Sequence, residues 1–89
     1  MGRRKARSPV KLARKLVYVR KTLGLSQNEL IERMGLKAKL RREEISDFER
    51  GKRVPPLLVL LRYARTANLH VDDFIDDEIN LATFKGQQQ

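Results

Sequence analysis

The stretch Gly24-Leu25-Ser26-Gln27-Asn28-Glu29-Leu30, residues 24–30, contains the clearest structural signal in the chain. Ser26 and Glu29 have the spacing of a capping box, in which each side chain accepts a hydrogen bond from the backbone N–H of the other residue. The pattern predicts a short helix of about eight residues that ends at Gly35. Its buried stripe is formed by Leu30, Ile31 and Met34.

Apolar spacing predicts a helix on the N-terminal side of this stretch. Ser8-Pro9 has the form of a helix start, since Ser can cap and Pro suits the first helical position. The helix is expected to run from there to about Leu23, and Gly24 is expected to end it in a left-handed conformation. Its core-facing residues are Leu12, Leu16, Val19 and Leu23.

A third helix is predicted before Gly51, with Ile45 and Phe48 as its only strong core anchors. A helix with so few apolar residues exposes a broad face, which is then available for binding. After the extended Val54-Pro55-Pro56 segment, a fourth helix is traced by Leu57, Leu60, Leu61, Ala64 and Ala67. A short fifth is indicated by Val71, Phe74, Ile75 and Ile79, with Asp72 and Asp73 in its first turn.

These signals predict an all-α fold, a compact bundle of about five short helices. The expected organisation is a basic N-terminal arm (residues 1–7), one domain (residues 8–79) and a C-terminal tail (residues 80–89). The chain has 89 residues and no cysteine, which excludes disulfides and cysteine-rich zinc sites. No secretory leader or membrane span is predicted, and a reducing cytoplasm is the expected setting.

The net charge of +9 is unevenly distributed. Residues 1–65 hold 19 Lys and Arg against 6 acids, a net of +13, whereas residues 66–89 hold one Lys against 5 acids, a net of −4. A basic body with an acidic end favours a polyanionic partner, either nucleic acid or, second, an anionic membrane surface.

The segment from residue 20 to residue 74 resembles the Cro/C1-type helix-turn-helix family, the lambda-repressor-like DNA-binding domains of the XRE family. The resemblance rests on residues in the same order and nearly the same register. They are Arg20, Gly24-Leu25-Ser26-Gln27, Glu29-Leu30, Gly35, Ile45-Ser46, Glu49, Gly51-Lys52-Arg53, Pro55, Leu60, Ala64, Leu69-His70-Val71-Asp72 and Phe74.

The resemblance implies that helices 2 and 3 form the helix-turn-helix, with helix 3 in the major groove of double-stranded DNA. It implies a transcription regulator, expected to be a repressor, that acts as a homodimer in the bacterial cytoplasm or nucleoid without a cofactor. It also implies that Arg20 and Glu49 form a structural ion pair between helices 1 and 3. The expected DNA-binding residues are Gln27, Asn28, Lys37, Lys39, Arg41, Arg42, Glu43, Ser46, Asp47, Arg50, Lys52 and Arg53.

Side-chain direction supports part of this set independently. If Ile45 and Phe48 point inward, then Arg42, Glu43, Asp47 and Arg50 point outward. Arg42 can pair with guanine, and Glu43 or Asp47 can accept a hydrogen bond from cytosine. The alternative interpretation is a solvated charged helix with i,i+4 contacts, among them a Glu49–Arg53 pair.

One departure from the family pattern lies between Gly35 and Ile45, where this chain has ten positions in place of about six. The extra residues either lengthen the turn or extend helix 3 at its N-terminus. Four cations crowd this stretch and are expected to contact phosphates or bases, or else to belong to a mobile solubilising loop: Lys37, Lys39, Arg41 and Arg42.

Other basic groups have two interpretations each. Lys52 and Arg53 contact the DNA backbone or are part of a basic surface turn, and the N-terminal arm follows a groove or is a disordered tail. That arm carries Arg3, Arg4, Lys5 and Arg7. Tyr18 and Tyr63 are expected at the edge of the core.

Catalysis is not expected, because the chain has one histidine and each serine has another explanation. Metal binding is not expected either, since the acidic cluster lacks the pattern of a calcium loop. The alternative function is an antitoxin or other protein-binding module that binds a partner as well as its operator. Ile79, Leu81 and Phe84 are the residues expected to contact such a partner or a second copy.

Overall fold

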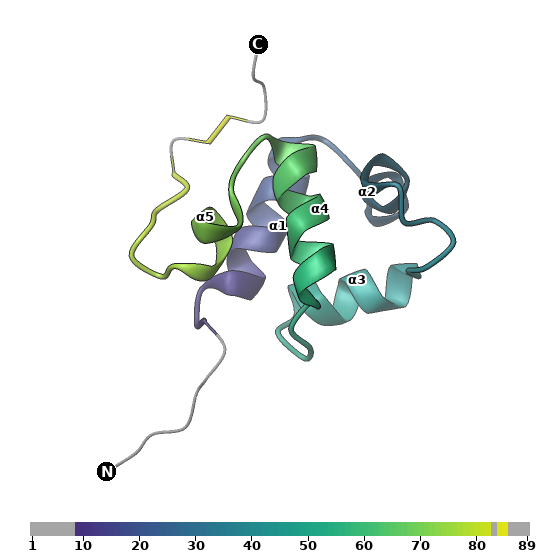
Figure 1. Ribbon diagram of the computed structural model, residues 1–89, viewed down its shortest axis with the longest axis horizontal. Coiled ribbons are helices and arrows are strands. Elements are labelled where there is room, and N and C mark those ends of the chain that lie inside the picture. The colour runs from purple at the N-terminus through teal and green to yellow at the C-terminus, as the bar shows by residue number, and fades with distance from the viewer. Residues whose placement is uncertain (1–8, 83, 86–89) are drawn as a thin grey trace.

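The computed structural model describes residues 9–82, 84 and 85. Across these residues it contains five helices and no strand, which confirms the predicted all-α bundle. α4 crosses in front of α1, with α2 and α3 on one side and α5 on the other (Figure 1). The helices are α1 (Leu12–Thr22), α2 (Gln27–Met34), α3 (Arg42–Glu49), α4 (Leu57–Ala67) and α5 (Val71–Ile75).

Each helix contributes large side chains to one core. α4 packs against α2 and α5, while α1 packs against α3 and α5. Tyr63 was expected at the edge of the core but lies at its centre, only 1% exposed, with its ring edge-on to Phe74. Tyr18 does lie at the edge, where its hydroxyl donates to the Phe84 carbonyl at 3.1 Å. The fully buried side chains include Tyr63, Phe48, Phe74, Leu16, Leu30, Ile45 and Val19.

The start of α1 corrects a prediction. The helix begins at Leu12 and not at Ser8-Pro9, and its N-cap residue, Lys11, makes no side-chain capping hydrogen bond. Ser8 lies outside the described residues. The cap is supplied from the other end of the chain, because the Asp77 carboxylate accepts hydrogen bonds from the backbone N–H groups of Val10 at 3.0 Å and Lys11 at 3.1 Å. A carboxylate at a helix N-terminus is also favoured by the helix dipole.

A buried lysine fastens α1 to α5. The Lys15 side chain is 7% exposed, and its ammonium group donates to the backbone carbonyls of Asp73 at 2.7 Å and Asp76 at 2.8 Å. Carbonyls at a helix C-terminus lack partners within the helix, so a cation there satisfies them and stabilises the end. Beyond α5, Leu81 is buried and Phe84 packs against the core.

The buried face of α4 differs in part from the predicted one. Leu60, Ala64 and Ala67 are buried as expected, but Leu57 is 72% exposed and Leu61 only partly covered. Val59 takes the core position in place of Leu57, because the helix is turned so that its tyrosine enters the core. α5 ends at Ile75, so Ile79 lies outside it. No described helix is long and apolar enough to cross a bilayer.

Candidate nucleic-acid interface

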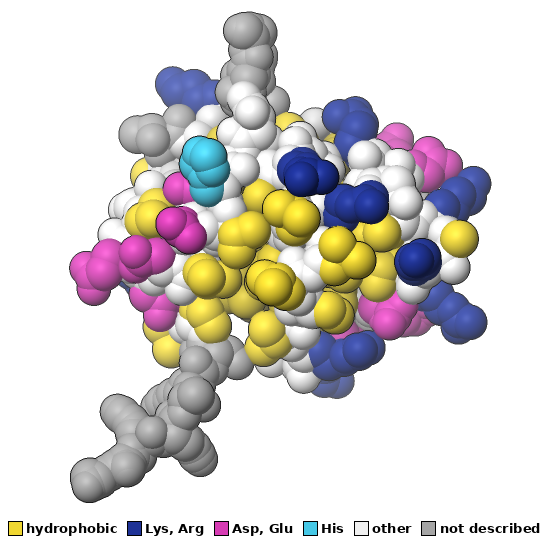
Figure 2. All heavy atoms as spheres, in the orientation of Figure 1, with side chains coloured by type: hydrophobic (Ala, Val, Ile, Leu, Met, Phe, Trp, Pro, Cys, Tyr) yellow, Lys and Arg dark blue, Asp and Glu magenta, His cyan; other side chains and the backbone are white. Residues whose placement is uncertain are grey.

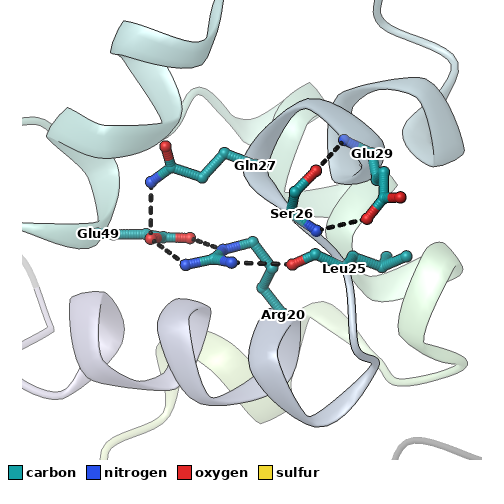
Figure 3. Close-up of polar contacts among 6 residues, drawn as sticks. All are labelled: Arg20, Leu25, Ser26, Gln27, Glu29 and Glu49. Atoms are coloured by element: carbon teal, nitrogen blue, oxygen red, sulfur yellow. Dashed lines mark hydrogen bonds and ion pairs between the residues drawn. The ribbon is translucent and has the colours of Figure 1, made fainter.

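The N-terminus of α2 is built by local hydrogen bonds. The Ser26 hydroxyl accepts from the Glu29 N–H at 3.0 Å, and the Glu29 carboxylate accepts from the Ser26 N–H at 2.8 Å (Figure 3). This is the predicted capping box. At the other end, Gly35 has a φ of 74°, and the Arg62 guanidinium donates to the Met34 carbonyl at 2.7 Å. α2 is therefore held firmly at both ends.

A buried ion pair links α1 to the last residue of α3. The Arg20 guanidinium donates to both oxygens of the Glu49 carboxylate, at 2.6 and 3.0 Å, and to the Leu25 carbonyl at 2.8 Å. The two side chains are only 13% and 7% exposed. The hydrogen bond to Glu49 raises the pKa of Arg20. A bidentate pair in a poorly solvated place fixes the angle of α3 against α1.

Gln27 completes this network at the first residue of α2. Its side-chain amide donates to the Glu49 carboxylate at 3.1 Å, so Gln27 and Arg20 converge on the same group (Figure 3). The sequence interpretation had placed this amide on DNA. In the structure it joins the start of α2 to the end of α3, while its second N–H and its carbonyl oxygen stay available for a further partner. Asn28 beside it is exposed.

Most of the carboxylates on α3 already have partners. Glu44 accepts from the Arg41 N–H at 3.0 Å and lies 3.6 Å from the Arg53 guanidinium, and Asp47 pairs with Arg50 at 3.2 Å. Only Glu43 is exposed with no such contact to the described residues. Internal pairing reduces the repulsion between this helix and phosphates, because the negative charges are compensated locally.

The outward face of α3 agrees with the predicted direction of its side chains. Ile45 and Phe48 are buried, while Arg42, Glu43 and Arg50 are exposed. Ser46 and Asp47 are partly covered. The helix thus presents a charged edge and holds the protein core with the opposite edge.

The residues between Gly35 and α3 lengthen the turn and do not extend the helix, since α3 begins at Arg42. Leu36 and Leu40 are buried, and the Leu36 carbonyl accepts from the N–H groups of Lys39 and Leu40, both at 2.9 Å. Leu40 was interpreted from the sequence as part of a basic stretch and not as a core residue. Its spacing of four positions from Leu36 was the signal that both leucines would be buried on the same side of the turn. The leucines fasten the turn and leave its cations outside: Lys37, Lys39 and Arg41 are exposed.

The two cations after α3 differ from one another. Arg53 folds back on the helix, with its guanidinium 5.8 Å from the Phe48 ring centroid and beside Glu44. The i,i+4 pair that the alternative interpretation assigned to Glu49 and Arg53 is therefore wrong, because Arg20 occupies Glu49. Lys52 is exposed, and the Asp47 carbonyl accepts from its backbone N–H at 2.9 Å. Lys52 thus has a fixed backbone and a free ammonium group among the described residues.

Charge is unevenly distributed across the visible face of the molecule. Figure 2 shows Asp and Glu gathered on the side of α5, whereas Lys and Arg stand together with some Asp and Glu on the side of α2 and α3. The acidic segment of the sequence thus forms an acidic side of the molecule, and the basic segment forms a side of mixed charge. The predicted N-terminal arm, residues 1–7, lies outside the described residues.

A family model described as helix-turn-helix matches residues 11–74, well over half of the chain. Neither a curated protein nor a solved structure matches significantly. The chain belongs to the helix-turn-helix family of Cro/C1 type, whose members are DNA-binding regulators. The matched segment extends from α1 to α5, so it includes the network that positions α3.

Proposed function

We propose that the protein binds a specific sequence of double-stranded DNA with α3 in the major groove and represses transcription there. The observation that carries the proposal is the support of α3, whose last residue, Glu49, is held by Arg20 and Gln27 together. A reading helix needs a fixed angle, because base contacts tolerate little displacement. This network supplies that angle while the charged edge of the helix stays open.

The proposed base contacts lie on the outward edge of α3. Arg42 is exposed and has no carboxylate partner among the described residues, so its guanidinium is free to take the O6 and N7 acceptors of a guanine. Glu43 is also exposed without an ion-pair partner among the described residues, so its carboxylate can accept a hydrogen bond from the N4 amine of a cytosine. Arg50 is oriented by its pair with Asp47, and Ser46 lies between the two ends of this edge.

The proposed phosphate contacts surround this edge. Phosphate contacts set affinity and register, whereas base contacts set sequence. The fastened turn supplies Lys39 and Arg41, together with Lys37, whose ammonium group lies 3.5 Å from the Glu32 carboxylate in an exposed pair. The N-terminus of α2 adds its helix dipole and the side chain of Asn28. Arg53 contributes less than Lys52, because it is already shared with Glu44 and Phe48. The phosphate set is Lys37, Lys39, Arg41 and Lys52, with Gln27 through its second N–H.

The test begins with selection of bound sites from random DNA and compares three variants on the selected site. Arg42→Ala is expected to relax preference at one base pair, with a loss of about tenfold on the cognate sequence. Lys52→Ala is expected to weaken all sequences alike and to lower the salt slope by about one. The control is Lys85→Ala, because Lys85 is an exposed lysine at the acidic end of the molecule. This variant is expected to keep both the sequence preference and the salt slope of the wild type. Equal losses on cognate and random DNA for Arg42→Ala would contradict the proposal.

The extended turn is tested separately. If Lys39 contacts a phosphate, Lys39→Ala lowers the salt slope by about one without altering the preferred sequence. An unchanged slope would assign the turn to solubility alone. The leucine anchors favour the first result, because a turn held by Leu36 and Leu40 keeps its cations in place.

The remaining parts of the proposal are a homodimer acting in the bacterial cytoplasm at the nucleoid. An antitoxin role was the alternative, and it relied on Ile79, Leu81 and Phe84 as an exposed contact surface. Leu81 is 9% exposed, and Ile79 and Phe84 pack against the core. These residues therefore favour closure of the protein's own core over capture of a partner, and we propose the regulator without that second activity.

A further inference from the structure

A groove lies between α1 and the segment that follows α5, and we call it the α1 groove. Its volume is about 330 Å³, which is within the range of small-molecule sites. None of the residues proposed to contact DNA lines it. The residues that line the α1 groove are Lys11, Arg14, Lys15, Tyr18, Ile79, Asn80, Leu81 and Ala82.

The apolar part of the α1 groove is held in place by the fold. The Tyr18 hydroxyl donates to the Phe84 carbonyl at 3.1 Å, and the Tyr18 ring lies edge-on to the Phe84 ring. Ile79 and Leu81 line the groove and also pack against the protein core. A ligand with an apolar body therefore covers apolar surface here without having to order flexible side chains first.

The charged part of the α1 groove contains only cations among the described residues, although the segment after α5 is acidic. Lys15 is already used, since its ammonium group donates to the carbonyls of Asp73 and Asp76. Lys11 donates one N–H to the Asp77 carbonyl at 3.1 Å, which leaves two donors.

Arg14 is the cation that this part of the fold leaves unused. It is exposed, and its guanidinium makes no hydrogen bond or ion pair with the described residues. It lies three positions after Lys11, so the two side chains share one side of the helix. The Asp77 carboxylate does not pair with Arg14, because it accepts from the backbone N–H groups of Val10 and Lys11. A guanidinium in this situation is suited to bidentate pairing with a carboxylate from another molecule.

We propose that the α1 groove binds a small carboxylic acid with an apolar body. The carboxylate pairs with Arg14, with Lys11 as the second cation, and the apolar body covers the Tyr18 ring and the side chains of Ile79 and Leu81. The Asn80 side-chain amide keeps its N–H donors for the same ligand, since its oxygen accepts from the Ala82 N–H at 2.7 Å. The inference goes beyond DNA binding and does not depend on it.

The ligand is expected to stabilise the protein. It contacts α1 and residues 79–82 together, and these segments lie side by side only in the folded chain. A molecule that binds the folded chain and not the unfolded one raises the midpoint of thermal unfolding. At a ligand concentration ten times the dissociation constant, the expected rise is about 5 °C.

The first experiment titrates the full chain with phenylacetate and with hexanoate, in the absence of DNA, by NMR. Amide shifts are expected to change at residues 11–18 and 79–82, with a dissociation constant of about 1 mM or lower. The ligand controls are 2-phenylethanol, which lacks the carboxylate, and acetate, which lacks the apolar body. Both are expected to bind at least about tenfold more weakly. No binding of either acid, or equal binding of 2-phenylethanol, overturns the proposal.

The second experiment changes the α1 groove itself. Arg14→Gln is expected to raise the dissociation constant of phenylacetate about tenfold and to remove the thermal stabilisation. The matched control is Arg65→Gln, which changes an exposed arginine of α4 outside the groove. Unchanged affinity in Arg14→Gln contradicts the assigned role of that guanidinium.

A third variant blocks the α1 groove by volume and keeps its charges. Ala82→Trp places a large side chain at an exposed lining position and is expected to abolish binding of both acids. Circular dichroism checks that the variants fold, and retained binding in Ala82→Trp would place the acids elsewhere. Failure of this proposal is distinguishable from failure of the proposed function. A chain that binds operator but neither acid overturns only the ligand site, and one that binds the acids without DNA sequence preference overturns only the proposed function.

Discussion

The two ends of α1 are held by different chemistry. At the C-terminal end, Arg20 forms a bidentate ion pair with Glu49, and this contact positions the proposed reading helix. At the N-terminal end, Asp77 and Lys15 bind neutral backbone groups and fasten the segment around α5. Both ends stabilise the same bundle, but the ion pair with α3 comes from the C-terminal end. We therefore expect stability and the proposed DNA recognition to be separable in this small domain.

The largest expected effect is at the ion pair. Glu49→Ala leaves the Arg20 guanidinium mostly buried without its carboxylate, and the expected loss in the free energy of unfolding is about 3 kcal/mol. DNA affinity is expected to fall about tenfold or more even under conditions where the variant is folded, since α3 loses its fixed angle. Urea unfolding and DNA titration measure the two effects.

A double variant, Arg20→Met with Glu49→Leu, is the control for this pair. It removes both charges, so part of the lost stability is expected to return while the DNA affinity stays low. If the double variant is less stable than the single one, the cost does not come from an uncompensated charge.

The second effect belongs to the other end of α1. Lys15→Met keeps most of the apolar stem but removes two hydrogen bonds to α5 carbonyls, and the expected destabilisation is about 2 kcal/mol. DNA affinity of the folded variant is expected to match the wild type. A specific loss of DNA affinity would show that the two ends are not separable.

A smaller effect is expected at the cap of α1. Asp77→Ala removes the acceptor for two backbone N–H groups and is expected to cost about 1 kcal/mol, the usual value of an N-cap. Glu78→Ala changes the neighbouring exposed carboxylate and is the control. Thermal unfolding of the two variants is compared, and equal midpoints would assign no capping role to Asp77.

The smallest effect is expected at a buried group that neither end of α1 uses. The Tyr63 hydroxyl has no hydrogen-bond partner among the described residues, so Tyr63→Phe is expected to change stability by less than about 1 kcal/mol near neutral pH. Burial raises the pKa of Tyr63 above its ordinary value of 10.0. The free energy of unfolding of the wild type is therefore unaffected by the Tyr63 phenol below pH 10.0. It falls as the pH rises further, because the phenol ionises in the unfolded chain before it ionises in the folded protein. Unfolding of both proteins across that range is expected to show the variant gaining relative stability.

The contrast between two helix starts explains which parts of the fold sequence patterns predict. Ser26 and Glu29 cap α2 from three positions apart, so their spacing is visible in the sequence. The cap of α1 comes from Asp77, 66 and 67 positions away from the groups that it binds. No local pattern contains that contact, and Ser8-Pro9 supplied a competing local signal. Local hydrogen bonds are predictable from spacing, whereas long-range ones depend on the assembled core.

The candidate site shows the same division. The outward direction of Glu43 and Arg50 follows from the burial of Ile45 and Phe48, which helical spacing predicts. The partners of long side chains do not follow from spacing. Arg53 takes Glu44, and Gln27 takes Glu49, because folding brings three elements to one place.

The Asp77 contact also has a consequence for how the molecule forms during translation. All-helical domains usually fold fast because most of their contacts join residues that are close along the chain. The hydrogen bonds between Asp77 and the start of α1 depart from that rule, because they join residues more than 60 positions apart. The first turn of α1 is made early by the ribosome but finds its acceptor only after residue 77 has emerged. In a nascent chain halted after α4, the pair between Arg20 and Glu49 can already form, but the start of α1 lacks its carboxylate cap. Emergence of residue 77 is thus the step that fixes the first turn of α1.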